Sequence, residues 1–266
     1  MARYGSWPRV DDPVTLSERQ RVPDLFDPWA SDLLDAVDLR SGERVLDVAC
    51  GTGVVARRAA GRMLPGGTVV GLDRLEPALD VARAAPAVLW RRGEASRLPF
   101  ADGAFDVVVC QQGLQVFPDR DRALLEMRRV LVLGGRVGVS VWGNIGRNPA
   151  FAALADSLER RAGVQVAAAV RWLFSLSEPE DLHALLAGAG FGRIRVLSAR
   201  RTTRFPSVAE FLRRYVPGAP VGSATTQLSE DDWRQVIADL ESDLAPWVDV
   251  DGLRIVTDAN TGVARG

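Results

Sequence analysis

Residues 44–53 read Arg-Val-Leu-Asp-Val-Ala-Cys-Gly-Thr-Gly, and this stretch decides the fold. A short apolar run ends in an acid, Asp47, and a glycine-rich turn of small residues follows at once. Residues 54–60 then have a helical pattern. A strand, a glycine loop and a helix in this order hold a nucleotide-like cofactor against the N-terminus of the helix. The stretch therefore predicts the cofactor-binding part of an α/β fold.

The acid in this stretch separates two classes of cofactor. A dinucleotide would place its pyrophosphate at the turn, where the carboxylate of Asp47 would repel it. S-adenosylmethionine (SAM) has no phosphate and carries an amino group there, so an acid is favourable. The segment Gly51-Thr52-Gly53-Val54-Val55-Ala56 also satisfies the dinucleotide pattern, but that pattern alone is weak evidence.

Further motifs follow the first along the chain. The apolar run 68–72 ends at Asp73, 20 residues after Gly53, where a second strand would present a carboxylate to two ribose hydroxyls. The remaining motifs are Gly93-Glu94-Ala95, Leu98-Pro99-Phe100, Phe105-Asp106-Val107-Val108-Val109, and Gly134-Gly135-Arg136 before residues 137–142.

Together these motifs resemble those of the class I SAM-dependent methyltransferases. The resemblance is closest to the bacterial ubiquinone/menaquinone-type and small-molecule members, the methyltransferase type 11 group. It covers essentially the whole chain, although the motifs that carry it lie between residues 44 and 142. It implies SAM as the cofactor and S-adenosylhomocysteine (SAH) as the product.

The resemblance also implies a role for individual residues at the cofactor. Asp47 would meet the amino group, Asp73 the ribose diol, and Glu94 the adenine edge, although the family often has Asp in place of Glu94. Gln111 would bind near the amino acid end of the cofactor or the acceptor, with Gln112 as its competitor. The other expected cofactor contacts are Ala49, Gly51, Thr52 and Gly53 along the methionine portion, Arg74 on the adenine face, and the Ala95 amide.

Aromatic residues give the best indication of the methyl acceptor. Seven of them fall on segments expected near the open end of the sheet, where ligands bind in this architecture: Phe26, Trp29, Phe117, Trp142, Trp172, Phe174 and Phe211. For any one of these rings a place in the core is the better interpretation. As a set they predict an apolar or aromatic small molecule, such as a quinone precursor or a secondary metabolite.

The catalytic residues cannot be assigned from the sequence. The chain has no lysine, and its one histidine, His183, lies in a helix expected away from the cofactor edge. We see no cluster of metal ligands near the cofactor motifs and therefore predict no metal site. Methyl transfer can proceed mainly through positioning of the reactants.

The alternation of apolar runs and helical patterns predicts a Rossmann-like, seven-stranded, mostly parallel sheet with helices on both faces. The resemblance implies that the last strand is antiparallel. A helical cap is expected to complete one methyltransferase domain over residues 1–266. Its parts would be an N-terminal arm (1–40, loose up to about residue 20 and then helical), a cofactor core (41–142), a substrate cap (143–177 and 204–250) and segments completing the sheet (178–203 and 251–266).

Composition narrows the classes of partner and compartment. A net charge of −1 gives no electrostatic reason to expect nucleic acid or an anionic membrane surface as a partner. Cys50 and Cys110 are expected as small apolar residues near the cofactor. Without a signal peptide or an apolar run of spanning length, we expect a cytoplasmic protein whose oligomeric state is open.

Two alternative functions remain at this stage. A SAM-binding protein that no longer methylates, such as a cyclase, scaffold or regulator, would keep the whole cofactor site. An NAD-dependent oxidoreductase is less favoured because of Asp47.

Overall fold

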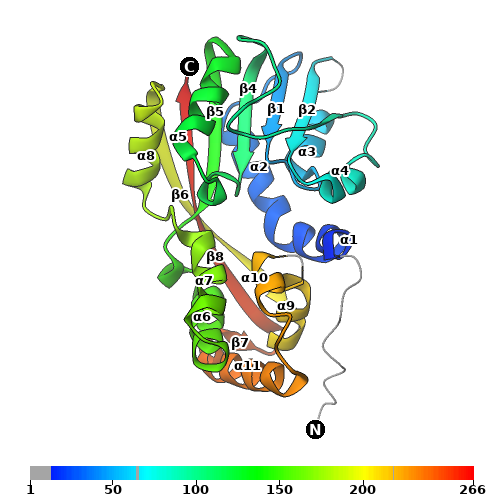
Figure 1. Ribbon diagram of the computed structural model, residues 1–266, viewed down its shortest axis with the longest axis vertical. Coiled ribbons are helices and arrows are strands. Elements are labelled where there is room, and N and C mark those ends of the chain that lie inside the picture. Colours follow the sequence, from blue (N-terminus) through cyan, green and yellow to red (C-terminus); the bar gives the residue numbers. More distant parts are fainter. Residues whose placement is uncertain (1–12, 64–65, 218) are drawn as a thin grey trace.

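The computed structural model describes residues 13–63, 66–217 and 219–266 (Figure 1). These residues form an eight-stranded sheet in the order β3-β2-β1-β4-β5-β8-β6, with β7 pairing with β8 beside this path. The strands are β1 (Arg44–Val48), β2 (Thr68–Asp73), β3 (Leu89–Arg92), β4 (Phe105–Gln111), β5 (Leu131–Trp142), β6 (Gly192–Phe205), β7 (Val248–Asp249) and β8 (Gly252–Arg265).

The strand directions confirm the predicted fold class. Strands β1 to β5 run parallel to one another, whereas β8 runs antiparallel between β5 and β6. Seven strands form the continuous path, and the eighth is the two-residue strand β7, which the sequence did not predict. It pairs with the start of β8 across a tight turn at Gly252, whose φ of 108° favours glycine.

The helices cover both faces of the sheet, as the alternating pattern predicts. Helices α2 and α3 pack on one face, and α5 and α8 on the other. The α-helices are α1 (Pro13–Leu16), α2 (Asp27–Ala36), α3 (Val54–Arg62), α4 (Glu76–Ala82), α5 (Arg120–Val130), α6 (Pro149–Ala162), α7 (Val164–Arg171), α8 (Pro179–Gly188), α9 (Val208–Tyr215), α10 (Pro220–Ala224) and α11 (Glu230–Asp243).

Five further helical segments have a different hydrogen-bond spacing. These are the π-helix η1 (Ser17–Phe26) and the short 3-10 segments η2 (Leu114–Val116), η3 (Ile145–Arg147), η4 (Trp172–Phe174) and η5 (Ala245–Trp247). Residues 13–20 are therefore helical, in contrast to the loose arm expected there, while residues 1–12 lie outside the described residues. Pro23 lies inside η1 and has no backbone N–H to donate to a hydrogen bond.

The cap stands on an extension of two strands beyond the rest of the sheet. Strand β5 pairs with β8 only over Ala259–Arg265, whereas β6 stays paired with β8 down to Leu253. Helices α6, α7, α9, α10 and α11 gather around this ribbon (Figure 1). The length of β6 has no apolar signal in the sequence, because this mostly exposed edge strand continues through Arg200-Arg201-Thr202-Thr203-Arg204.

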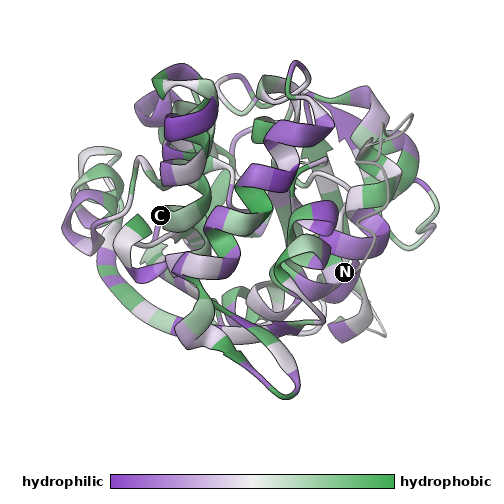
Figure 2. Ribbon diagram, turned by 90° about the horizontal axis from the view of Figure 1, so that it is seen from below, coloured by the Kyte–Doolittle hydropathy of each residue, from purple (hydrophilic) through white to green (hydrophobic). Residues whose placement is uncertain are grey.

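The cap has its own aromatic core. Phe151 of α6 lies at its centre, with ring centroids 5.6 Å from Phe174, 5.8 Å from Phe211 and 4.9 Å from Tyr215. The helices are banded with hydrophilic and hydrophobic residues in Figure 2, as amphipathic helices with one buried face are. Within the described part of the chain, no helix is both long enough and apolar enough to cross a bilayer.

We predict that Phe151→Ala lowers the free energy of unfolding by about 3–5 kcal/mol, because it leaves a cavity among packed rings. Urea unfolding followed by circular dichroism measures this change. Leu133→Ala is the matched control, since Leu133 is 99% exposed while Phe151 is 0% exposed. A loss below about 1 kcal/mol in Phe151→Ala would show that the cap core is not rigidly packed.

Candidate active site

Two adjoining cavities open at the carboxyl ends of β1, β2 and β4. The first cavity, of about 390 Å³, is lined by Asp73, Glu94 and Phe117 among others, and the second, of about 280 Å³, by Asp47, Gln111 and Tyr215 among others. Both are lined by the same four residues where they meet: Ala49, Leu75, Gln112 and Val116. Ligands bind at this edge in open α/β sheets, so the pair forms the candidate site.

Backbone bends at the ends of β1 and β4 shape the junction of the cavities. Ala49 and Gln112 each have a φ of 57°, a left-handed conformation that is uncommon for residues other than glycine. Such backbone conformations concentrate at functional sites, where the surrounding structure maintains them. Gly51 also has a positive φ, of 55°, and lines the second cavity with its open Cα face.

Asp47 is a buried acid that joins β1 to the start of α3. Its Oδ2 accepts a hydrogen bond of 3.0 Å from the Ala56 amide, while its Oδ1 is buried and has no partner among the described residues. Burial, followed by the nearby charge of Asp73, raises the pKa of Asp47 to about 8, against the lowering effects of the Ala56 amide and Arg57. A cationic group beside Oδ1 would lower this pKa and favour the carboxylate form.

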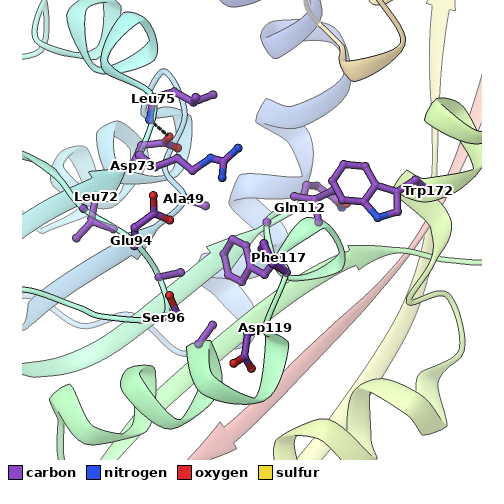
Figure 3. Close-up of a pocket in the computed structure, with 17 residues that line it drawn as sticks. Ala49, Leu72, Asp73, Leu75, Glu94, Ser96, Gln112, Phe117, Asp119 and Trp172 are labelled. Carbon is purple, nitrogen blue, oxygen red and sulfur yellow. Dashed lines mark hydrogen bonds between the residues drawn. The ribbon is translucent and has the colours of Figure 1, made fainter. Parts of the chain in front are cut away.

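Asp73 presents a fixed carboxylate to the first cavity. Its Oδ2 accepts from the Gly51 amide and its Oδ1 from the Leu75 amide, both at 2.8 Å (Figure 3). These two bonds orient the group between the glycine loop and the start of α4. Each oxygen keeps a second lone pair, so the carboxylate can still accept two hydrogen bonds from a diol.

The rest of the first cavity is largely apolar. Figure 3 shows Asp73 and Glu94 on one side and Phe117 across from them, with Trp172 farther along the opening. Leu72, Ala95 and Pro118 add to its wall. Glu94 is exposed, and Trp172 is 48% exposed at the mouth. A flat apolar group with a polar edge matches this lining.

The N-terminal helical segment covers the second cavity. Glu18 of η1 accepts a hydrogen bond from the Thr52 hydroxyl and forms an ion pair with Arg57. The Gln111 amide donates to the Phe26 carbonyl oxygen at 2.8 Å. These contacts tie the segment to the glycine loop and to the end of β4. The sequence analysis named Phe26 and Gln111 but missed Glu18, because nothing in the pattern before residue 20 indicates a helix.

Three glutamines leave polar atoms without partners in the second cavity. The atoms are Gln111 Oε1, Gln112 Nε2 and Gln115 Oε1, which are buried and unpaired among the described residues. Gln115 donates to Gln112 Oε1 at 2.7 Å. Buried polar atoms in native proteins almost always have a hydrogen-bond partner, so this cluster requires water or a ligand. The sequence analysis did not select Gln115, which lies beyond the strand end that the motif covers.

The structure brings nine of the ten predicted cofactor residues to the cavities and leaves one elsewhere. Asp73, Arg74, Glu94 and Ala95 line the first cavity, Asp47, Gly51, Thr52 and Gln111 the second, and Ala49 both. Gly53 lines neither. Its φ is 91°, and a Cβ there would come within 2.2 Å of the Trp90 ring, so this glycine permits close packing at the start of α3.

The predicted aromatic pocket residues divide into two groups. Phe117 and Trp172 line the first cavity, and Phe26 and Trp142 the second. Trp29, Phe174 and Phe211 do not line either cavity, which corrects their prediction. Trp29 is buried and donates to the Thr257 hydroxyl at 3.2 Å, while Phe174 and Phe211 pack around Phe151 in the cap. Spacing alone cannot separate a ring that lines a cavity from one in the adjacent core.

Two further residues also line a cavity, Asp119 the first and Cys50 the second, whereas Asp106, Cys110 and His183 line neither. Asp106 pairs with Arg44 at 2.9 Å, and Asp119 caps α5 by accepting from the Arg122 amide. Cys50 and Cys110 are free and buried, and His183 is exposed on α8. In residues 13–63, 66–217 and 219–266, no three His, Cys, Asp or Glu side chains are grouped to hold a metal.

Comparisons with known proteins agree with this geometry. A family model described as "Methyltransferase domain" matches residues 46–139. The chain is similar to the ubiquinone/menaquinone biosynthesis C-methyltransferase UbiE of Ectopseudomonas mendocina (strain ymp), at 34% identity over 62% of this chain and 72% of that protein. It is also similar to the nocamycin O-methyltransferase of Saccharothrix syringae, at 40% identity over 44% of each chain.

Solved structures share the fold. A putative methyltransferase from an antibiotic biosynthesis pathway of Anabaena variabilis ATCC 29413 has a TM-score of 0.62 at 16% identity, covering 91% of this chain and 98% of that one. The chain spans about half of the length of several curated relatives that it matches.

The raised pKa of Asp47 predicts the direction of a pH effect on stability. The folded state keeps this proton up to about pH 8, whereas the unfolded chain loses it near pH 4, so rising pH destabilises the fold between these values. Asp47→Asn cannot ionise. We expect its free energy of unfolding, relative to wild type, to rise from pH 5 to pH 8 by on the order of a few kcal/mol, measured by urea unfolding.

Asp106→Asn is the matched control because its sign is opposite. Hydrogen bonding from Arg44 lowers the pKa of Asp106, so this group stabilises the fold at neutral pH and loses that contribution in acid. The control should lower the free energy of unfolding at pH 7 by about 1 kcal/mol or less, since the pair is partly exposed. If the free energy of unfolding of Asp47→Asn relative to wild type stays constant with pH, the raised pKa of Asp47 is contradicted.

Proposed function

Because the chain belongs to the family of SAM-dependent methyltransferases, we propose that it transfers a methyl group from SAM to a small molecule. The acceptor atom is an oxygen, nitrogen or carbon of an apolar or aromatic compound. The observation that carries this proposal is the meeting of two cavities at Ala49 and Gln112, one with the fixed Asp73 carboxylate and the other with buried, unpaired polar atoms.

The residues present fit SAM better than a dinucleotide. The buried Oδ1 of Asp47 lacks a partner and would accept a hydrogen bond from the cationic amino group of the methionine portion. Asp73 would hold the ribose hydroxyls, and the apolar slot beside Phe117 would take the adenine. An acid, Asp47, lies at the glycine loop where a pyrophosphate would lie, and Arg57 is already paired with Glu18.

The second cavity supports an apolar acceptor next to the methionine end. Phe26 and Trp142 contribute rings whose centroids are 5.9 Å apart, and Val22 and Leu173 add apolar surface. Similar proteins are named for methylation of a quinone precursor at carbon and of nocamycin at oxygen. We infer that the acceptor is a quinone precursor or a secondary metabolite. This inference does not choose between carbon and oxygen as the methylated atom.

Catalysis in this site rests on positioning and on exclusion of water. When bound, SAM supplies an electrophilic methyl group that leaves its sulfur by in-line displacement. The helix η1, which covers the second cavity, would shield it from solvent and hold the acceptor beside the methionine end of the cofactor. Orientation of this kind contributes effective molarities of roughly 10⁵ M or more.

None of the titratable side chains that line the second cavity is suited to act as a general base at neutral pH. Burial raises the pKa of Tyr215 to about 12 and the pKa of Cys50 well above its ordinary value, and Asp47 faces the cofactor. An acceptor that is acidic or already ionised needs no such base.

We predict that Asp73→Asn raises the dissociation constant for SAH by about 10- to 100-fold, since it removes charge-assisted hydrogen bonds to the ribose. Isothermal titration calorimetry of wild type and variant measures this. Asp80→Asn on the surface of α4 is the control, because its only described ion pair, with Arg83, is exposed. Binding of NAD in place of SAH would overturn the cofactor assignment, and SAH binding without methyl transfer to any compound of an apolar acceptor panel would favour a non-methylating role.

A further inference from the structure

Arg21 lies in the second cavity and has no counter-charge among the residues that the structure describes. It lies on η1, lines the cavity, and donates from Nε to the Ser17 hydroxyl at 2.9 Å. Its guanidinium carbon lies 5.2 Å from the centre of the Phe26 ring. Among the described residues it forms no ion pair, so most of its five N–H donors are free for a ligand.

The arginines around it differ in this respect. Those that contact the N-terminal helices are each paired with an acid: Arg57 with Glu18, Arg58 with Asp27, Arg62 with Asp35, Arg201 with Asp32 and Arg214 with Asp24. Glu18, one turn before Arg21, is bound to Thr52 and Arg57. Among the described residues, the charges that attach this segment to the rest of the protein are therefore paired. The charge of Arg21, which faces the cavity, is not.

Arg21 lies at the cap end of the cavity. Its helix η1 contacts α9, which carries Tyr215, and both side chains line the second cavity. Tyr215 is 3% exposed, stacks on Phe211 with centroids 5.7 Å apart, and its hydroxyl has no partner among the described residues. Burial lowers the pKa of Arg21 to about 10, which still leaves it charged at neutral pH. A partly buried cation without an anion costs free energy that an anionic ligand would recover.

We propose that Arg21, with the Tyr215 hydroxyl as a second donor, binds an oxyanion of the methyl acceptor. The acceptor class is then an apolar organic acid, bearing a carboxylate or an ionised enol or phenol. This inference rests on the proposed methyltransferase function and extends it to the substrate. It agrees with the lack of a suitable base, because an acceptor that binds in its ionised form needs none.

The oxyanion that Arg21 binds could also be the carboxylate of the cofactor. The experiment therefore tests the cofactor and the acceptor separately. Calorimetry measures SAH and 5′-methylthioadenosine, which lacks the amino acid carboxylate, on wild type and Arg21→Gln. In the presence of saturating SAH, the same proteins are titrated with matched acids and amides: benzoate and benzamide, 2-naphthoate and 2-naphthamide. Arg19→Gln, an exposed neighbour on η1, is the control for the change in net charge.

Wild type should bind at least one acid about tenfold or more tightly than its amide, as a charge-assisted hydrogen bond provides. Arg21→Gln should lose this preference, Arg21→Lys should keep part of it, and Tyr215→Phe, which keeps the stacked ring, should reduce it. Arg19→Gln should behave as wild type. The affinity for SAH should stay within about twofold in every variant, which also shows that each is folded.

Three results would overturn the inference. The first is that wild type binds no acid more tightly than its amide. The second is that Arg21→Gln still binds the acid more tightly than the amide. The third is a loss of SAH affinity in Arg21→Gln with unchanged binding of 5′-methylthioadenosine, which would assign Arg21 to the cofactor carboxylate. Failure of wild type to bind SAH at all would instead refute the proposed function.

Discussion

The hydrogen bond between the buried Asp47 carboxyl group and the Ala56 amide is the interaction on which the site depends. It ties the end of β1 to the first turn of α3 and so sets the path of the loop between them. Because the bond uses one carboxyl oxygen, the other remains buried with no partner in the part of the chain that the structure describes. The same residue therefore stabilises the fold and creates a place for a cationic group, at the cost of a raised pKa.

A second constraint is the length of the ribbon formed by β6 and β8. The ribbon continues past the end of β5 and carries the cap, and the cap and the core are linked by ion pairs from Asp24 and Asp32 of the N-terminal segment. This places η1 between glycine loop and cap, over the second cavity. The acceptor end of the site is thus assembled from three parts of the chain that are far apart in sequence.

Electrostatics divides the site into two regions of opposite sign. Asp47 and Asp73 make the glycine-loop side acidic, which suits a cofactor with a cationic amino acid end and no phosphate. Arg21 and the Tyr215 hydroxyl make the cap side a donor surface within aromatic walls. We interpret this separation as the basis for holding a cationic methyl donor and an anionic acceptor in one enclosed space, where charges attract more strongly than in water.

Residues 44–142 by themselves determined the parallel sheet and the positions of Asp47, Asp73 and Glu94, because apolar runs and glycine turns are local signals that report strand ends directly. The tertiary structure alone decided which aromatic residues line a cavity, since Trp29 and Phe26 are both large aromatic residues in one amphipathic pattern and only Phe26 reaches the second cavity. It also decided that Glu18, Arg21 and Gln115 belong to the site. Their roles follow from long-range contacts, which no local spacing encodes.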